Sequence, residues 1–121
     1  MAFTDVTPRI VNWDPDTASE VTLAAACKAG DLLMYEAGWI LADIDVATNV
    51  QVACKDGAVG DKIPVAPFVL ISSFLEATPG GPLCTTAGLG YQQDTGMTVG
   101  FFLSATQAYV IPLLVAAAAP V

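Results

Sequence analysis

Histidine is absent from this chain of 121 residues, and lysine and arginine together number only four, against twelve acidic residues. Without histidine the chain lacks the commonest general base, the usual hydrolase triads and most zinc or non-haem iron sites. The net charge is −8, and the four basic residues form no cluster of the kind that displaces counterions from phosphates. We therefore expect no nucleic-acid partner and no binding to an anionic membrane surface.

Long hydrophobic runs are also missing. The longest charge-free apolar stretch, "AYVIPLLVAAAAPV", is broken by Pro112 and Pro120 and is shorter than the roughly 20 residues of a membrane helix. The first residues, "MAFTDVTPRIVNWD", have no basic region and no apolar core of a signal peptide. We expect no membrane partner.

Cysteine is scarce, and its spacing does not suit a disulfide framework. Cys27, Cys54 and Cys84 are odd in number, far apart and without a CxxC pair. A disulfide scaffold or a zinc site is therefore not expected. We predict three small, buried free thiols in a reducing compartment.

Charge is nearly missing from the second half of the chain. Residues 63–121 hold only Glu76 and Asp94, whereas residues 1–62 hold all four basic residues and ten of the twelve acidic ones. A free surface built from so few charges would be adhesive. We predict that partner subunits cover much of it. The predicted subunit-contact residues are Phe101, Phe102, Tyr109, Ile111, Leu113 and Leu114.

Short segments of alternating apolar residues recur along the chain, separated by Gly, Pro, Asn and Asp. This spacing predicts an all-β fold, a small antiparallel β-barrel or β-tulip-like domain over residues 20–121, with a sandwich as the open alternative. Residues 15–30 could instead be helical, with Asp16 or Thr17 as N-cap. A weak internal repeat matches "AGDLLMYEAGW" to "GGPLCTTAGLG".

Residues 1–19 are interrupted by Pro8 and Pro15 and read as an extended N-terminal arm. The arm carries spaced apolar side chains that would suit docking on a neighbouring subunit. The predicted docking residues are Phe3, Arg9, Ile10 and Trp13.

Two glycine turns stand close together in "CKDGAVGDKIPV", residues 54–65. The stretch is not a phosphate-binding loop, because it lacks the four-residue gap and the GK[ST] ending, and Pro64 prevents a following helix. "KDG" instead favours a tight hairpin in which Gly57 adopts positive φ. The loop is therefore interpreted as structural.

Paired carboxylates are the remaining candidate for chemistry. Asp43 and Asp45 would share one face of a strand, where they could hold Ca²⁺ or Mg²⁺ or serve a hydrolase acting on sugars. The stretch lacks the further ligands of an EF-hand, aromatic residues are few and scattered, and no cysteine has a histidine partner. We expect no catalytic, cofactor-binding or metal-binding residue, no cofactor, and no enzyme.

The run "VTLAAACKAGDLLMYEAGWILADIDVATNVQVACKDGAVGDKIPV" resembles the small head decoration, or cement, proteins of tailed bacteriophages. The shared features are an early "VTL-A" strand, then "GDLL", then a glycine followed by "ILADIDVATNVQVA", and a closing "IPV". The C-terminal "GGPLCTTAGLGYQQDTGMTVGFFLSATQAYVIPLL" fits a repeat of the same pattern. The resemblance covers roughly residues 18–115.

This resemblance implies a β-rich structural virion protein on the outside of an icosahedral capsid. It implies the major capsid protein as partner, homotrimers at the local threefold positions, and a terminal arm that contacts the shell. It places the protein on the outer surface of the virion, after synthesis in the host cytoplasm. The alternative is a small β-barrel module that binds a glycan or another small ligand, which would need a pocket with converging aromatic residues.

Overall fold

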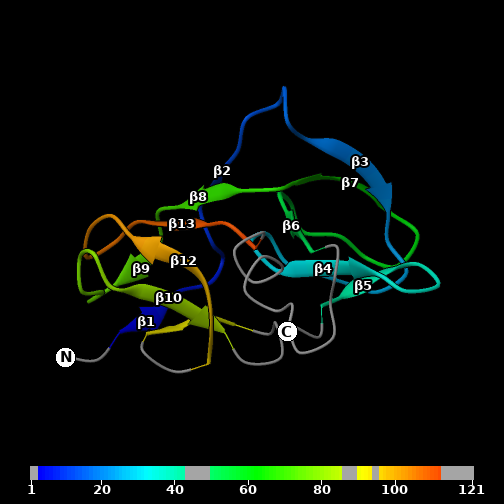
Figure 1. The fold of residues 1–121 in the computed structure, drawn as a ribbon. Coiled ribbons are helices and arrows are strands. Elements are labelled where there is room, and N and C mark those ends of the chain that lie inside the picture. The colour runs from blue at the N-terminus through cyan, green and yellow to red at the C-terminus, as the bar shows by residue number, and fades with distance from the viewer. Residues whose placement is uncertain (1–2, 43–49, 86–89, 94–95, 113–121) are drawn as a thin grey trace, which may run out of the picture.

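The computed structural model describes residues 3–42, 50–85, 90–93 and 96–112 (Figure 1). These residues form thirteen strands and no helix: β1 (Thr4–Asp5), β2 (Val11–Asn12), β3 (Ser19–Thr22), β4 (Leu32–Tyr35), β5 (Trp39–Leu41), β6 (Gln51–Ala53), β7 (Lys62–Ala66), β8 (Val69–Ile71), β9 (Phe74–Leu75), β10 (Pro82–Thr85), β11 (Gln92–Gln93), β12 (Met97–Phe102) and β13 (Ala108–Val110). The predicted all-β class is confirmed.

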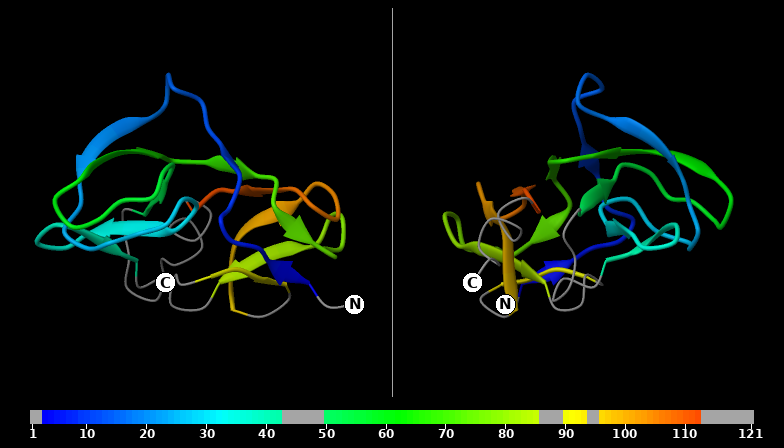
Figure 2. Two further views of the ribbon diagram at one scale, coloured as in Figure 1. Left: turned by 180° about the vertical axis from the view of Figure 1, so that it is seen from behind. Right: turned by 45° about the vertical axis from the view of Figure 1, so that its right-hand side comes forward.

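The described strands form three antiparallel sheets, and they do not close into a barrel. One sheet has six strands in the order β11-β10-β12-β13-β8-β2, another has five in the order β3-β7-β6-β4-β5, and β1 pairs with β9. The two larger sheets lie side by side and are bridged by the chain that runs from β7 into β8 (Figures 1 and 2). A second bridge is the segment between β2 and β3, which crosses in the opposite direction.

The N-terminal segment is extended and lies against the domain. Within it, β1 pairs with β9, and β2 pairs with β8 as the edge strand of the six-stranded sheet. The region from Pro15 to Gly30, for which a helix was the alternative, instead contains β3 and a loop. Its N-cap candidate Thr17 donates its backbone N–H to the carbonyl of Asp14 at 3.1 Å, in a turn.

Four strands of the five-stranded sheet belong to two segments that follow the same backbone path. Each copy is a strand, a loop and a second strand, β3 to β4 and β6 to β7, and the copies exchange partners, because β3 pairs with β7 and β4 pairs with β6. The two loops also form a bridge in which Cys27 and Gly57 exchange both backbone hydrogen bonds, at 2.9 and 3.0 Å. The arrangement has local twofold character.

Equivalent hydrogen bonds recur in the two copies. The N–H of Gly30 donates to the carbonyl of Ala53 at 2.7 Å, and the N–H of Gly60 donates to that of Leu23 at 2.8 Å. Both glycines have left-handed φ, +87° and +90°, at the third position of a four-residue turn, where glycine avoids the clash of a Cβ. The repeat therefore relates residues 19–35 to 51–66. The segments matched in the sequence share the same turn, because Gly80, ahead of β10, also has left-handed φ, +82°, and donates its N–H to the carbonyl of Phe102 at 2.8 Å.

The aspartate that follows each glycine closes its turn. Asp31 Oδ2 accepts the backbone N–H of Lys28 at 2.9 Å, and Asp61 Oδ2 accepts that of Ala58 at 2.8 Å. Such a bond satisfies a backbone donor that the turn would leave unpaired. A third turn, ahead of β10, has no aspartate at this position, and the Gln93 side chain accepts the Thr78 N–H there at 2.8 Å.

The predicted tight hairpin at "KDG" is wrong. Residues 54–61 form a long connection between β6 and β7, and the glycine with left-handed φ is Gly60, not Gly57. Gly57 is needed for a different reason: a Cβ there would lie 2.5 Å from Leu23 Cδ1 and 2.9 Å from Ile63 Cγ2. The absence of a side chain lets the two loops approach each other.

The core divides into two clusters. The larger includes Ile71, Phe74, Phe102 and Val110 and packs under the six-stranded sheet, while the smaller includes Leu33 and lies on the opposite face of the five-stranded sheet. Strand β4 alternates between the two, so both of its faces are covered. This accounts for the uninterrupted apolar run Leu32–Met34, all of it buried, whereas Tyr35 at the end of the strand is exposed.

Candidate functional site

No group of three or more His, Cys, Asp or Glu side chains that could hold a metal ion occurs among the residues that the structure describes. Asp43 and Asp45, the carboxylate pair considered from the sequence, lie outside the described residues. The three cysteines are free and buried, as predicted. Burial raises the pKa of Cys27, with help from the charges of Asp31 and Asp56, and burial raises that of Cys54, each to about 11. Neither thiol is activated as a nucleophile.

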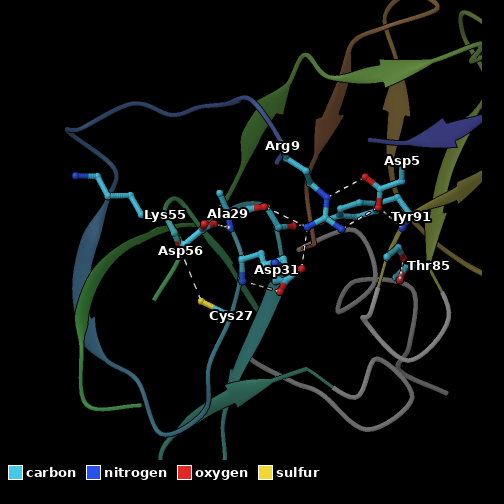
Figure 3. Close-up of polar contacts among 12 residues, drawn as sticks. Asp5, Arg9, Cys27, Ala29, Asp31, Lys55, Asp56, Thr85 and Tyr91 are labelled. Atoms are coloured by element: carbon cyan, nitrogen blue, oxygen red, sulfur yellow. Dashed lines mark hydrogen bonds and ion pairs between the residues drawn. The ribbon is translucent and has the colours of Figure 1, made fainter. Parts of the chain in front are cut away.

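Arg9, one of the predicted docking residues, is the centre of a network of polar contacts. Its guanidinium donates to both carboxylate oxygens of Asp5, at 2.9 and 2.8 Å, and to Asp31 Oδ1 at 2.8 Å (Figure 3). It also donates to the carbonyl of Ala29 at 3.1 Å. The Arg9 side chain is only 5% exposed. Arg9 therefore faces the interior of its own chain, where it ties the N-terminal segment to the turn before β4.

Tyr91 completes this network. The Arg9 guanidinium lies 5.1 Å from the centre of the Tyr91 ring, and the Tyr91 hydroxyl donates to the carbonyl of Gly30 at 2.5 Å. Burial raises the pKa of Tyr91 well above its usual value. Burial alone would lower the pKa of Arg9, but hydrogen bonds to Asp5 and Asp31 outweigh it and keep that pKa above its usual value. The network has a structural role: the Arg9 guanidinium pairs with the carboxylates of Asp5 and Asp31 inside the protein.

Two further predicted contact residues, the partly buried Phe3 and the buried Phe102, pack in or on the core of the fold. Phe3 packs its ring on Phe74 and Phe102, with centroids 5.4 and 5.3 Å away. Phe102, predicted as a subunit contact, is 1% exposed and belongs to the larger core cluster. The reason is the alternation of a strand: Phe101 and Phe102 are adjacent in β12, so only one can face outward.

The residues that do face outward form a row across the six-stranded sheet. The register places Phe101 opposite Tyr109, Tyr109 opposite Leu70, and Leu70 opposite Asn12. Pro82 extends the row beyond Phe101 on β10. The rings of Phe101 and Tyr109 have centroids 5.7 Å apart. We call this row the outer face; it is uncharged and largely apolar, and the alternating residues of β8, β12 and β13 fill the core beneath it.

Ile10 belongs at one end of the outer face. Its carbonyl accepts the N–H of Ser72 at 2.9 Å, so it continues the pairing of β2 with β8, two residues before Asn12. Its side chain is 58% exposed. The structure thus brings Ile10, from the predicted arm, to the same face as the predicted contacts Phe101 and Tyr109. Ile111 is half-buried directly after β13, and Leu113 and Leu114 lie outside the described residues.

A groove lies beside Tyr109 at the edge of the outer face. It has a volume of about 200 Å³. The residues that line it are Asn12, Trp13, Asp14, Phe68, Val69, Leu70 and Tyr109. Trp13, the last of the predicted docking residues, is half-buried and also packs on the core. Asp14 Oδ1 accepts the backbone N–H of Asp16 at 2.9 Å, which holds the carboxylate in place.

Sequence reasoning missed Leu70 and Phe68 as surface residues and Asp5, Asp31 and Tyr91 as partners of Arg9. Alternation within "FVLISSFL" was a usable signal for Leu70, because it separates Val69 and Ile71 from the residue between them. The partners of Arg9 carry no local signal, since Tyr91 and Asp31 come from distant parts of the chain.

Comparison of the chain with protein-family models, with curated proteins and with solved structures gave no match. Within the described residues, no helix is long and apolar enough to cross a membrane.

Proposed function

We propose that this protein is a non-catalytic structural subunit that docks on a larger assembly through its outer face. The observation that carries the proposal is the uncharged row Phe101, Tyr109 and Leu70, which crosses three neighbouring strands. The row continues to Asn12 on β2, two residues from the exposed Ile10. A contiguous apolar surface of this kind is typical of protein interaction sites. The aromatic pair at its centre is the kind of group that dominates interface energetics.

The assembly that we propose is the outer surface of an icosahedral phage capsid. Support comes from the resemblance of "VTLAAACKAGDLL" and "ILADIDVATNVQVA" to head decoration proteins, and from the charge distribution, which leaves one half of the chain almost without charge. Homotrimers at the threefold positions of the major capsid protein lattice would cover apolar surface by closed contacts. Repeated weak contacts over a shell add to durable attachment.

The first experiment is to measure how many copies of the chain purified particles contain, by quantitative mass spectrometry against the major shell protein. A fixed ratio set by the lattice supports decoration, and absence from the particles overturns it. Docking is then tested by co-sedimentation of shells with a Phe101→Ser, Tyr109→Ser double variant. We expect binding to fall at least tenfold, since the centre of an interface carries most of its energy. The matched control is Val59→Ser, which changes a 68%-exposed apolar residue on a loop away from the outer face.

A second candidate function, a small glycan-binding module, is favoured by the groove alone. Trp13, Phe68 and Tyr109 line it together with the polar Asn12 and Asp14, and sugars bind in such aromatic settings with a few polar groups. A thermal-shift assay against a glycan panel tests this candidate. Stabilisation by one glycan that is lost in Tyr109→Ser would favour it over docking.

A further inference from the structure

The groove at the edge of the outer face has a chemical character that the rest of that face lacks. Three aromatic residues, Trp13, Phe68 and Tyr109, line this groove of about 200 Å³, and the acidic residue Asp14 lines it as well. The row from Phe101 to Leu70 has aromatic and apolar groups but no charge. The groove is therefore the one place on this part of the described surface where aromatic rings and a negative charge meet.

We propose that the groove binds an arginine side chain from an extended segment of the partner protein, a proposal that rests on the docking function above. A guanidinium is planar, so it can stack on the face of an aromatic ring while it pairs with a carboxylate. Its three methylene groups cover apolar surface on the way in. A lysine also carries a positive charge, but its ammonium is a compact point charge without a planar face to stack on a ring.

Charge complementarity within the chain supports a basic occupant. No basic residue lines the groove. Arg9 is committed to Asp5 and Asp31 in the interior. The chain has a net charge of −8, which favours the approach of a basic segment. Arginine is also one of the residue types enriched at the hot spots of protein interfaces, the few residues that supply most of the binding energy.

A purely apolar occupant fits less well. It would cover the rings but would take water from Asp14 without replacing its hydrogen bonds, which costs free energy. Asp14 cannot turn away freely, because its Oδ1 already accepts the Asp16 N–H at 2.9 Å. An arginine side chain donates hydrogen bonds that replace those that Asp14 loses when water leaves the groove.

The test uses the full chain and three blocked tripeptides, with arginine, citrulline or norleucine at the central position. Citrulline is the neutral analogue of arginine, and norleucine supplies only the apolar stem. Binding is followed by NMR through the indole N–H signals of the two tryptophans, which a Trp39→Phe variant assigns. We expect the arginine peptide to shift Trp13 but not Trp39, which pairs with Tyr35 elsewhere on the surface. We expect citrulline to bind at least threefold more weakly.

Two variants locate the effect. Asp14→Asn keeps the Oδ1 that accepts the Asp16 N–H but removes the charge, and should weaken arginine binding about threefold while leaving citrulline binding unchanged. Phe68→Leu keeps apolar bulk but removes an aromatic face, and should weaken arginine binding by about two- to fivefold. Asp16→Asn is the matched control. Asp16 lies two residues after Asp14 but does not line the groove, so the variant removes the same charge outside the groove. It should have no more than a small effect on arginine binding.

Several results would overturn the proposal. Equal binding of norleucine would assign the groove to an apolar side chain, and a shift of Trp13 by monosaccharides but not by arginine would assign it to sugars. Equal weakening of arginine binding by Asp14→Asn and Asp16→Asn would show that overall charge, not Asp14, causes the effect. The absence of any Trp13 shift with the arginine peptide would also reject the proposal. These measurements use the isolated protein, so a negative result rejects only arginine binding in the groove. Failure of the protein to co-sediment with shells would instead reject the docking function.

Discussion

Arg9 and Asp31 stand 22 positions apart in the sequence, and an ion pair of 2.8 Å joins Nη1 of the first to Oδ1 of the second. The same Asp31 accepts the N–H of Lys28 through its other oxygen and so closes the turn that leads into β4. One carboxylate therefore fixes both the turn and the N-terminal segment. The segment is consequently part of the folded domain, and its outward residues are presented from a rigid support.

Replacing Arg9 with methionine should strongly destabilise the fold. The change leaves Asp5 and Asp31 facing each other without their common cation, and removal of one partner from a buried ion pair typically costs about 3–5 kcal/mol. Because the two carboxylates retain 14% and 13% exposure, we expect the lower end of that range, about 3 kcal/mol. Urea denaturation followed by far-ultraviolet circular dichroism measures the change.

The control for this prediction is Arg9→Lys, which keeps the charge but loses the planar fork of donors. It should recover only part of the lost stability, because one ammonium cannot serve both oxygens of Asp5 as well as Asp31 and Ala29. A methionine variant as stable as the parent would show that the network contributes nothing to folding.

Gly57→Ala and Gly60→Ala should destabilise the protein for different reasons. At Gly57 a new Cβ would lie 2.5 Å from Leu23 Cδ1, so overpacking should cost about 1–3 kcal/mol. At Gly60 nothing lies within 4 Å of the new atom, and the cost, about 1–2 kcal/mol, comes from φ of +90°. A Leu23→Val background separates the two causes: it should relieve part of the Gly57→Ala penalty and none of the Gly60→Ala penalty. Equal effects in both backgrounds would contradict the packing explanation.

Stability should fall as the pH rises from about 9 to about 11. The folded state holds the pKa of Cys27 and Cys54 at about 11, above their usual value of about 9. The unfolded chain therefore loses these protons first, so deprotonation favours unfolding across this interval, and the stabilisation is complete below it. Tyr91 acts in the same direction, since its pKa is also raised. Denaturation midpoints measured through the interval should decline less steeply in a Cys27→Ala, Cys54→Ala variant; an identical slope would exclude the thiols as the cause.

The sequence was sufficient for the all-β class and for the buried cysteines, because strand alternation and thiol burial are local properties. It was insufficient for the duplication of β3–β4 and β6–β7, whose copies share little beyond Gly30-Asp31 and Gly60-Asp61. The repeated Gly-Asp pair was the available signal, since each position has its own backbone requirement. The inward position of Arg9 could not be predicted, because its burial depends on partners that only the tertiary fold brings together.

Deletion of residues 1–15 should unfold or strongly destabilise the domain. The deletion removes the ring of Phe3 from between Phe74 and Phe102, removes Arg9 from its network, and exposes the edge of β8. Deletion therefore cannot separate docking from folding. Thermal unfolding monitored by calorimetry should show a much lower transition temperature or none; a truncated protein with unchanged stability would show that the segment adds nothing to the fold.

Ile10→Asp and Val59→Asp provide the cleaner test of how the N-terminal segment contributes to docking. Both side chains are exposed, 58% and 68%, so both variants should fold with stability close to that of the parent. Only Ile10 stands at the end of the outer face, where a carboxylate would have to be desolvated without a partner on association. We expect Ile10→Asp to weaken shell co-sedimentation and self-association in analytical ultracentrifugation by roughly tenfold or more, because an unpaired charge in an interface opposes binding directly. Val59→Asp adds the same charge at a turn remote from that face, so a comparable loss there would mean that overall charge, and not the outer face, governs assembly.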